Sequence, residues 1–263
     1  MATQPFSLAV VVGSATKILT QNTSQMVVEF DGFESVPASS LTLDSYNIPG
    51  AVYQGSKYQP RPMTLTIYFT SKSYYSSNID SLIQFFKTGQ EAFLIYGDQI
   101  NNLKYAITAV IESLTLPRFN SPSKGWLAMQ IGLVAYNPFW RAAGLASTVT
   151  HAFNTSFSIN NTGNVEMPVS ISIASGTAIS NPVITLNSTD TLSLTGSFSA
   201  EIEINTEDRT IIYNNANGIQ YWTHGSKWLK LPPGTNTITF SADATSTRST
   251  TITYRPMFTG VVH

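Results

Sequence analysis

Hydrophobic side chains recur at every second position in several runs between residues 6 and 135, which is the period of a β-strand with one buried face. The clearest run is 63–70, where the side chains at positions 63, 65, 67 and 69 are all apolar. Turn-forming pairs such as Asp31-Gly32 and Pro49-Gly50 separate the runs. The pattern predicts strands at 6–12, 27–30, 41–43, 63–70, 92–96, 105–116 and 126–135.

One segment follows the helical period instead. Its apolar side chains would form a single stripe, and we expect this helix to lie across the open face of a sheet. Ser77, with Asp80 three residues later, resembles a capping box, and Gly89 would stop the helix. The stripe consists of Ile79, Leu82, Ile83 and Phe86.

The second half of the chain shows no helical period. Short alternating segments recur and are bounded by Gly, Pro and Asn, which is typical of an antiparallel β-sandwich. Asn217-Gly218 predicts a type I′ hairpin turn, and the run from Pro232 to Gly234 predicts a tight connection between two strands. The expected strands are 153–159, 169–173, 183–186, 192–194, 202–204, 210–213, 228–231, 238–240 and 250–254.

The two halves meet where a strand ends in aromatic residues. A residue before proline avoids helical conformations, and proline offers no amide hydrogen to a sheet, so the strand 126–135 must end before Pro138. The sequence therefore predicts a first domain at 1–140, a hinge at 141–148 and a second domain at 149–263. The residues that mark this junction are Tyr136, Asn137, Pro138, Phe139 and Trp140.

The composition favours a protein that is packed against other subunits. Charged side chains make up 11% of the 263 residues, against roughly 25% in ordinary soluble domains. The net charge is −1 without a basic stripe, so sequence-independent binding of nucleic acid lacks its electrostatic driving force. The absence of cysteine excludes disulfides and thiolate chemistry.

The N-terminal sequence and the hydropathy of the chain bear on its location. Residues 1–12 lack the basic segment of a signal peptide, and no apolar run approaches the roughly 18 residues of a membrane span. We therefore expect synthesis in a cytoplasm, without a Sec signal and without membrane insertion.

Candidate catalytic or metal-binding side chains are few. Glu203, Glu207 and Asp208 could form a paired-carboxylate or Ca²⁺ site, although residues 207–209 are more simply a charged hairpin turn. The three histidines form no metal-binding pattern, and no nucleophile elbow, phosphate-binding loop or dinucleotide motif occurs. We expect neither an enzyme nor a cofactor. The histidines are His151, His224 and His263.

Aromatic residues between positions 213 and 228 are a possible ligand platform. Tyr213, Tyr221, Trp222 and Trp228 lie close together in sequence, and such platforms on β-sandwiches bind sugars. The preferred interpretation is that Tyr221 and Trp228 pack inside the sandwich. The candidates for docking or glycan binding are Tyr221, Trp222 and His224.

Four sequence features together resemble the distal tail protein (Dit) family, the tail-tip hub of long-tailed, siphovirus-type bacteriophages. Arg61, at the head of a strand after a polar loop, fits the same family pattern. The four features are Ala135-Tyr-Asn-Pro-Phe-Trp140, Asn161-Thr-Gly-Asn with Pro168 and the strand 169–173, the run 228–236 with Ile238, and Thr251-Ile-Thr-Tyr-Arg-Pro256.

The resemblance implies a mainly β fold with two domains. In such proteins an N-terminal belt domain, a β-sandwich or split barrel with one helix, forms a ring that is commonly a homohexamer. The ring encloses a channel for DNA passage, without specific binding of the DNA. A C-terminal galectin-like β-sandwich projects outward. The implied partners are the tail tube protein, a tail-associated fibre or hub protein and receptor-binding proteins, at the tail tip of a virion assembled in the host cytoplasm.

Two hypotheses follow for this sequence. The ring seam would use the strands 6–12 and 27–30 with the polar segment 13–25 as an extended arm. The outer domain would dock a neighbouring protein and not a glycan, because no polar cluster beside an exposed tryptophan is evident. A carbohydrate-binding or adhesin module and a tail-tube subunit remain alternatives. The candidate subunit contacts are Phe6, Leu8, Val10, Val27, Val28, Phe30 and Arg61.

Overall fold

The structure is a computed structural model that describes residues 6–19, 26–44, 51–69, 72–98, 103–116, 127–153, 155–242 and 248–261. The chain divides into two compact units. The first comprises Met1–Ala143 together with Thr259–His263, and the second is Gly144–Phe258. The second unit is therefore an insertion, because the chain returns to the first unit after leaving the second.

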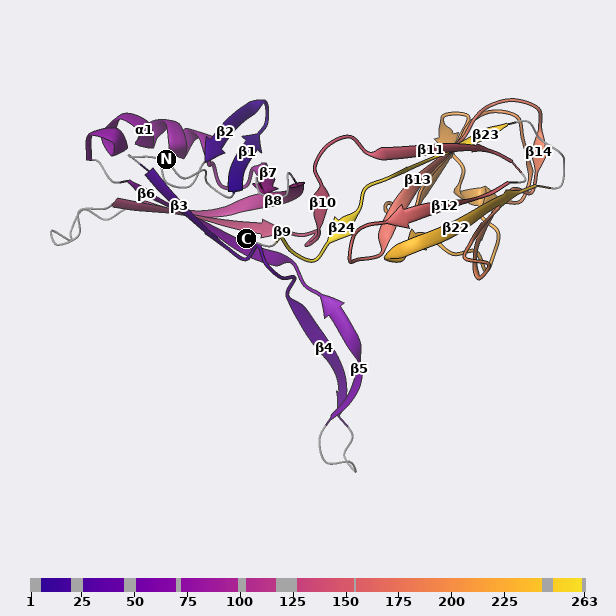
Figure 1. The fold of residues 1–263 in the computed structure, drawn as a ribbon, viewed down its shortest axis with the longest axis horizontal. Coiled ribbons are helices and arrows are strands. Elements are labelled where there is room, and N and C mark those ends of the chain that lie inside the picture. Colours follow the sequence, from indigo (N-terminus) through magenta and orange to yellow (C-terminus); the bar gives the residue numbers. More distant parts are fainter. Residues whose placement is uncertain are drawn as a thin grey trace. The chain divides into compact units, whose positions relative to one another are not determined.

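The first unit is built on one antiparallel sheet with the strand order β2-β1-β7-β8-β9-β6-β3 (Figure 1), and β10 pairs with β8. In β6 the four apolar side chains of the predicted alternation are all buried, while the positions between them are not, which confirms this strand. The strands are β1 (Phe6–Val12), β2 (Ala15–Leu19), β3 (Met26–Asp31), β6 (Arg61–Phe69), β7 (Glu91–Asp98), β8 (Leu103–Thr115), β9 (Leu127–Ala135) and β10 (Trp140–Ala142).

The helix α1 (Lys72–Phe85) carries the predicted stripe but begins earlier than expected. Ser77 and Asp80, the expected cap, are exposed within the helix, so that prediction is wrong. Leu82 and Phe86 are buried in the core, and the amide of Phe86 still donates to the carbonyl of Leu82 at 2.8 Å. No described helix is long and apolar enough to cross a membrane.

The polar segment 13–25 is not an extended arm where the structure describes it. Residues 13–14 form a turn, and β2 runs back along β1 with Leu19 opposite Leu8. The remainder of the segment, residues 20–25, lies outside the described residues.

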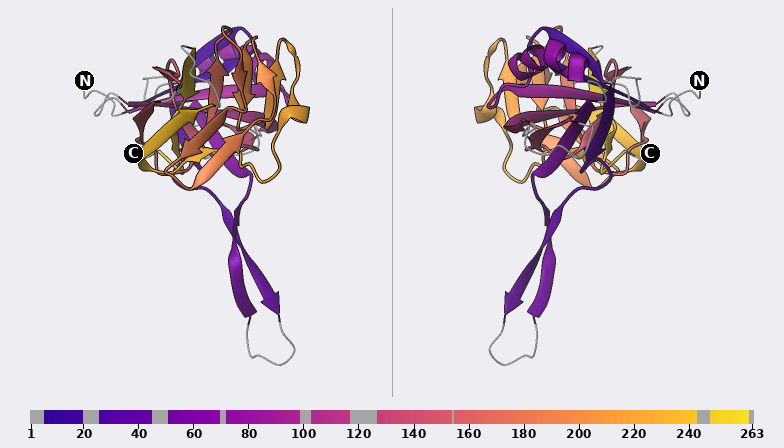
Figure 2. Two further views of the ribbon diagram at one scale, coloured as in Figure 1. Left: turned by 90° about the vertical axis from the view of Figure 1, so that its right-hand side faces the viewer. Right: turned by 90° about the vertical axis from the view of Figure 1, so that its left-hand side faces the viewer.

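Two further strands of the first unit form a separate two-stranded hairpin, β4 (Ala38–Asp44) with β5 (Ala51–Tyr58). The hairpin extends away from the sheet of its own unit, as all three ribbon views show (Figures 1 and 2). Its base is fixed by the Gln59 amide, which donates to the Pro37 carbonyl at 2.9 Å, and by the Gln59 side chain, which donates to Ser39 Oγ at 2.7 Å.

The second unit consists of antiparallel sheets, with the main strand orders β11-β23-β13-β18-β19-β20 and β12-β22-β15-β16. β21 pairs with β13, and β14 pairs with β17. The mainly β fold is therefore confirmed. The elements are β11 (Ser147–Ala152), β12 (Ser156–Asn161), β13 (Met167–Ile173), β14 (Ile179–Ser180), β15 (Val183–Leu186), β16 (Asp190–Ser193), β17 (Ser197–Phe198), β18 (Ile202–Asn205), β19 (Thr210–Tyr213), β20 (Ala216–Asn217), η1 (Ile219–Tyr221), β21 (Lys230–Leu231), β22 (Gly234–Ser241), β23 (Ser249–Tyr254) and β24 (Met257–Phe258).

The predicted turns of the second unit have mixed outcomes. The type I′ prediction at Asn217-Gly218 is wrong, because Gly218 has φ −108°. The hairpin between β19 and β20 turns instead at Asn214 and Asn215, whose φ values are +51° and +60°. The predicted connection at Gly234 is present between β21 and β22, with φ +94°, a conformation that favours glycine.

Candidate functional site

Arg61, at the start of β6, is fully buried and binds backbone carbonyls. Its Nε donates to the carbonyl of Pro138 at 2.8 Å, and Nη1 donates to those of Gly32 and Phe33, both at 3.0 Å. Nη2 donates to the carbonyl of Thr259. One guanidinium therefore joins the segment after β3, the junction after β9 and the returning C-terminal segment.

Burial lowers the pKa of Arg61 to about 10, and the carboxylate of Glu34 opposes this shift. The group stays protonated at neutral pH, so its five donors remain available to the carbonyls. A fork of fixed donors suits several diverging acceptors better than the single ammonium of lysine.

The junction residues take different positions. Trp140 is fully buried and packs on Phe33, with ring centroids 5.1 Å apart, while Tyr136 is exposed and its hydroxyl lies 3.3 Å from Glu112 Oε1. Pro138 is buried, and Phe139 packs edge-on against Tyr58 at the base of the β4–β5 hairpin. Asn137 is exposed, and its Oδ1 accepts from the Phe139 amide at 3.5 Å. This segment is a packed part of the first unit.

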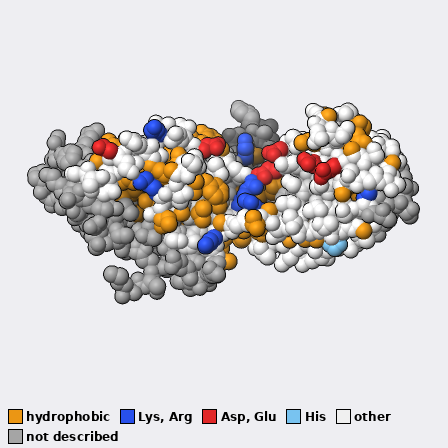
Figure 3. All heavy atoms as spheres, turned by 90° about the horizontal axis from the view of Figure 1, so that it is seen from above, with side chains coloured by type: hydrophobic (Ala, Val, Ile, Leu, Met, Phe, Trp, Pro, Cys, Tyr) orange, Lys and Arg blue, Asp and Glu red, His pale blue; other side chains and the backbone are white. Residues whose placement is uncertain are grey.

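The β4–β5 hairpin carries large apolar side chains that are exposed to solvent. Leu41 is 50% exposed, Tyr53 64% and Tyr58 50%. Neither strand pairs with any other described strand. On the body of the same unit, Ile18 and Phe93 are also exposed, and Figure 3 shows apolar atoms gathered on the face of this unit that is seen from above.

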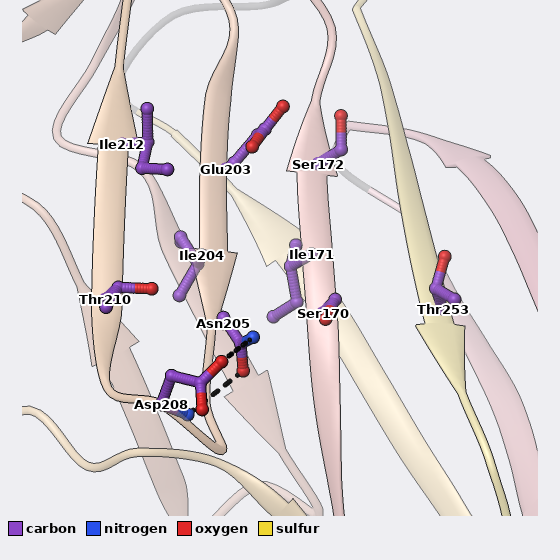
Figure 4. A pocket seen from close by; sticks show the side chains of 10 residues that line it. All are labelled: Ser170, Ile171, Ser172, Glu203, Ile204, Asn205, Asp208, Thr210, Ile212 and Thr253. Atoms are coloured by element: carbon purple, nitrogen blue, oxygen red, sulfur yellow. Dashed lines mark hydrogen bonds between the residues drawn. The ribbon is translucent and has the colours of Figure 1, made fainter. Parts of the chain in front are cut away.

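The second unit has a groove on the solvent face of its larger sheet, across β23, β13, β18 and β19 (Figure 4). We call it the outer groove. Its volume is about 380 Å³. Its lining residues are Ser170, Ile171, Ser172, Glu203, Ile204, Asn205, Asp208, Thr210, Ile212 and Thr253.

Two of the three carboxylates predicted as a metal site, Glu203 and Asp208, line this groove, while Glu207 is not among its lining residues. Asp208 belongs to the turn after β18, where Asn205 Oδ1 accepts from the amides of Glu207 and Asp208, and Asn205 Nδ2 donates to Asp208 Oδ2 at 2.6 Å. The described residues hold no group of three or more His, Asp or Glu side chains placed to bind a metal. The segment is the charged hairpin turn that the sequence favoured.

The aromatic candidates lie around the η1 segment. Trp222 stacks on Trp228, with centroids 4.2 Å apart, and both are half-buried. Tyr221 is half-buried and packs edge-on against Phe198 and Tyr213. Of the histidines, His224 is exposed, His151 stacks on Phe157 at 3.8 Å, and His263 lies outside the described residues.

Two family models match the chain. The siphovirus-type tail component, C-terminal domain, matches residues 162–258, and the phage tail protein RIFT-related domain matches residues 15–125. Together they cover more than half of the chain. The chain belongs to the distal tail protein family of siphovirus-type phages. It is a structural protein of the virion's tail tip.

Several solved structures are similar to this chain, and the first of them shows the same fold. The Dit protein of phage SPP1, described as a hub adsorption apparatus in phages that infect Gram-positive bacteria, matches with a TM-score of 0.71 and 13% identity, covering 95% of this chain and 99% of that chain. A baseplate of phage P2 in its activated conformation matches with a TM-score of 0.48 and 8% identity, covering 97% and 99%. The tube-terminating cap of the anti-feeding prophage matches with a TM-score of 0.30 and 16% identity, covering 51% of this chain and 86% of that chain. No curated protein sequence matches.

The structure places most subunit-contact candidates of this distal tail protein inside the first unit. Leu8, Val10 and Val28 are buried in the core, and Phe30 is half-buried against Phe33. β1 is paired with β2 on one side and β7 on the other, so neither edge is left for a neighbouring copy, contrary to expectation. A seam at β3, the last strand of the sheet, stays a prediction. Phe6 and Val27 are described only by their backbones, in β1 and β3.

In the second unit, the residues that carried the family resemblance hold loops in place. Asn161 is buried, its Nδ2 donates to the carbonyls of Val165 and Leu231, and its Oδ1 accepts from the Gly163 amide. A Cβ on Gly163 would lie 2.2 Å from the carbonyl oxygen of Met257. These motif residues therefore have structural roles.

Sequence reasoning missed two surface features, the projecting β4–β5 hairpin and the outer groove. The extent of the β4–β5 hairpin was hidden because both of its faces are polar or exposed over long stretches, which leaves no alternation. The outer groove could not be recognised in the sequence because Ser and Thr are common throughout this chain. Short polar residues at alternate positions on neighbouring strands are the signal that could have indicated it.

Proposed function

We propose that this distal tail protein assembles through its first unit into a closed ring, six-fold as in its family. The ring would join the tail tube to the proteins of the tip and leave a channel for DNA. The exposed β4–β5 hairpin is the observation that carries this proposal. A two-stranded ribbon is marginally stable alone in water, and three large apolar side chains on it gain free energy when they are covered.

A second copy of the chain is the partner that fits best. A ring needs head-to-tail contacts, in which a projecting element of one copy meets a different surface of the next. A projecting hairpin supplies one half of such a contact, and the exposed apolar side chains on the body, such as Ile18 and Phe93, offer a surface for the other half. The low share of charged residues removes a source of repulsion between copies.

One face of the first unit suits a channel wall. A groove of about 400 Å³ there is lined by two carboxylates and by uncharged side chains, and none of its described lining residues is basic. Carboxylates repel the phosphates of passing DNA, so the nucleic acid would not be retained. The lining residues are Glu29, Phe30, Asp31, Thr64, Thr66 and Gln130.

Native mass spectrometry of the purified chain tests the ring. We expect a hexamer or its multiples, and we expect the double variant Leu41→Asp/Tyr53→Asp to be monomeric, because each change places a charge on the surface to be covered. Leu145→Asp is the matched control, since Leu145 is fully exposed outside the hairpin. A monomeric native chain at high concentration, or hexamers of the double variant, would contradict the proposal.

A docking role for the second unit rests on the stacked Trp222 and Trp228. Half-buried tryptophans are typical anchors of protein interfaces. We propose that a tip or receptor-binding protein docks on this pair. Pull-down of tip proteins by the full chain should be lost in Trp222→Ala, and equal capture by this variant and the native chain would exclude the pair as the anchor.

A further inference from the structure

Docking of a protein at Trp222 and Trp228 does not explain the features of the outer groove. Its floor is made by short hydroxyl side chains of neighbouring strands, Ser170 and Ser172 on β13 and Thr253 on β23 (Figure 4). Glu203 on β18 stands beside Ser172 in this view. Ile212 on β19 is 39% exposed at the side of the groove. A polar floor with one apolar side is thus open to solvent.

The hydrogen bonds within the groove show which polar atoms are available. Asn205 and Asp208 bind each other in the turn, and Ser172 Oγ donates to Glu201 Oε1 at 2.7 Å. The carboxylate of Glu203 has no hydrogen-bond or ion-pair partner among the described residues. It is therefore the strongest free acceptor in the groove.

The outer groove continues toward the edge of the sheet. A second hollow of about 410 Å³ shares Thr210 and Ile212 with it and reaches Asn217 and Ile219 beside η1. The combined depression crosses several strands, so an elongated ligand fits it better than a compact one. The backbone groups of these strands are already paired in the sheet, and only side chains can bind the ligand.

The chemistry of the lining selects among elongated ligands. Hydroxyl groups both donate and accept hydrogen bonds, as sugar hydroxyls do, and a carboxylate can accept from two adjacent hydroxyls. No basic residue is among the described residues that line the outer groove, and Arg209 is the one described basic residue that lines the adjoining hollow. Glu203 and Asp208 would therefore repel phosphorylated or acidic polymers from the outer groove itself. The cores of protein interfaces are rich in aromatic residues, Met and Arg and poor in Ser, which disfavours a protein partner here.

We propose that the outer groove binds an uncharged saccharide chain. The Glu203 carboxylate accepts hydrogen bonds from adjacent sugar hydroxyls, the hydroxyls of β13 and β23 contact the next positions, and Ile212 packs against the C–H face of a ring. The proposal rests on the proposed function for its biological setting at the tail tip, while the binding itself needs no ring. It differs from the expected glycan candidates, which centred on Trp222.

An oligosaccharide array probed with the full chain tests this site. The array contains neutral, acidic and amino-substituted oligosaccharides, with a lysine-rich peptide as a further probe. We expect saturable binding of neutral chains that weakens about tenfold in Glu203→Gln, which keeps the size of the side chain but loses its charge. Glu166→Gln is the matched control, since Glu166 is an exposed carboxylate of the same unit outside the groove.

Several results would overturn the proposal. These are no saturable binding of any neutral chain, equal binding by Glu203→Gln and the native chain, or a preference for acidic chains or the peptide. Ile212→Asp is the second variant, and it should also weaken binding if a sugar ring packs on Ile212. Native mass spectrometry of the same samples reports the ring separately, so a failed ring and a failed saccharide site are distinguishable.

Discussion

At the scale of single residues, Arg61 shows how a sequence motif becomes a structural requirement. The sequence identified Arg61 only as the first residue of a family-like strand and as a subunit contact. Its buried guanidinium instead binds carbonyls from three segments that are distant in sequence. Alternation places β6 in the core, but it carries no information on which distant carbonyls meet at its first residue.

Replacing Arg61 should destabilise the first unit. Arg61→Met leaves buried carbonyls without donors, and each such group costs about 1–3 kcal/mol, so a loss of about 3 kcal/mol or more is expected. Denaturant unfolding measures it. Arg209→Lys, at an exposed turn, is the control and should change stability by less than about 0.5 kcal/mol. Equal midpoints for both variants would show that Arg61 is dispensable.

The lowered pKa of Arg61 also fixes where pH can act through this residue. Its pKa in the folded chain, about 10, lies below the ordinary value of an arginine, so above pH 10 the unfolded chain binds more protons. This group therefore adds stability only as the pH rises through that alkaline range. Between pH 5 and 9 Arg61 is charged in both the folded and the unfolded chain, so it does not make the free energy of unfolding depend on pH.

At the scale of elements, hydrophobic alternation succeeded where a strand has one buried face. β6 follows the pattern because its apolar side chains point into the core. β2 and the β4–β5 hairpin are exposed at most described positions and therefore show no such period. The start of α1 was missed for the same reason, because the apolar stripe occupies only the later turns of the helix.

The hairpin turn between β19 and β20 gives a test of local conformation. Asn215 has φ +60°, which a β-branched residue tolerates poorly. Asn215→Val should cost about 1–2 kcal/mol, while Asn215→Gly should be nearly neutral. Thermal unfolding measures both. Ala216→Val, on the exposed strand β20, is the control, and a cost equal to that of Asn215→Val would mean that the turn lies elsewhere.

At the scale of the whole molecule, two units are interleaved along one chain. The sequence indicated the junction near Trp140 from its aromatic residues and proline. It gave no sign that residues 259–261 pack with the first unit, because so short a segment has no readable period. Val261 is nevertheless buried, and its amide donates to the carbonyl of Phe33 at 3.1 Å.

Fragments cut at different boundaries should differ in stability. We expect residues 144–258 to fold alone, because β11 begins at Ser147 and pairs with β23 inside this range. The fragment 149–263 lacks the start of β11 and should unfold at a lower temperature. Circular dichroism melting compares them. A higher midpoint for 149–263 would place the boundary where the sequence predicted it.

The return of the chain to the first unit also sets an order of events during synthesis. A Cβ on Gly260 would lie 1.6 Å from the carbonyl oxygen of Glu34, so the two backbones touch, and Arg61 binds the neighbouring Thr259. The ribosome releases residues 259–261 only after all of the inserted unit. The nascent first unit must therefore wait, with Arg61 still lacking the Thr259 carbonyl, until the inserted unit has been translated.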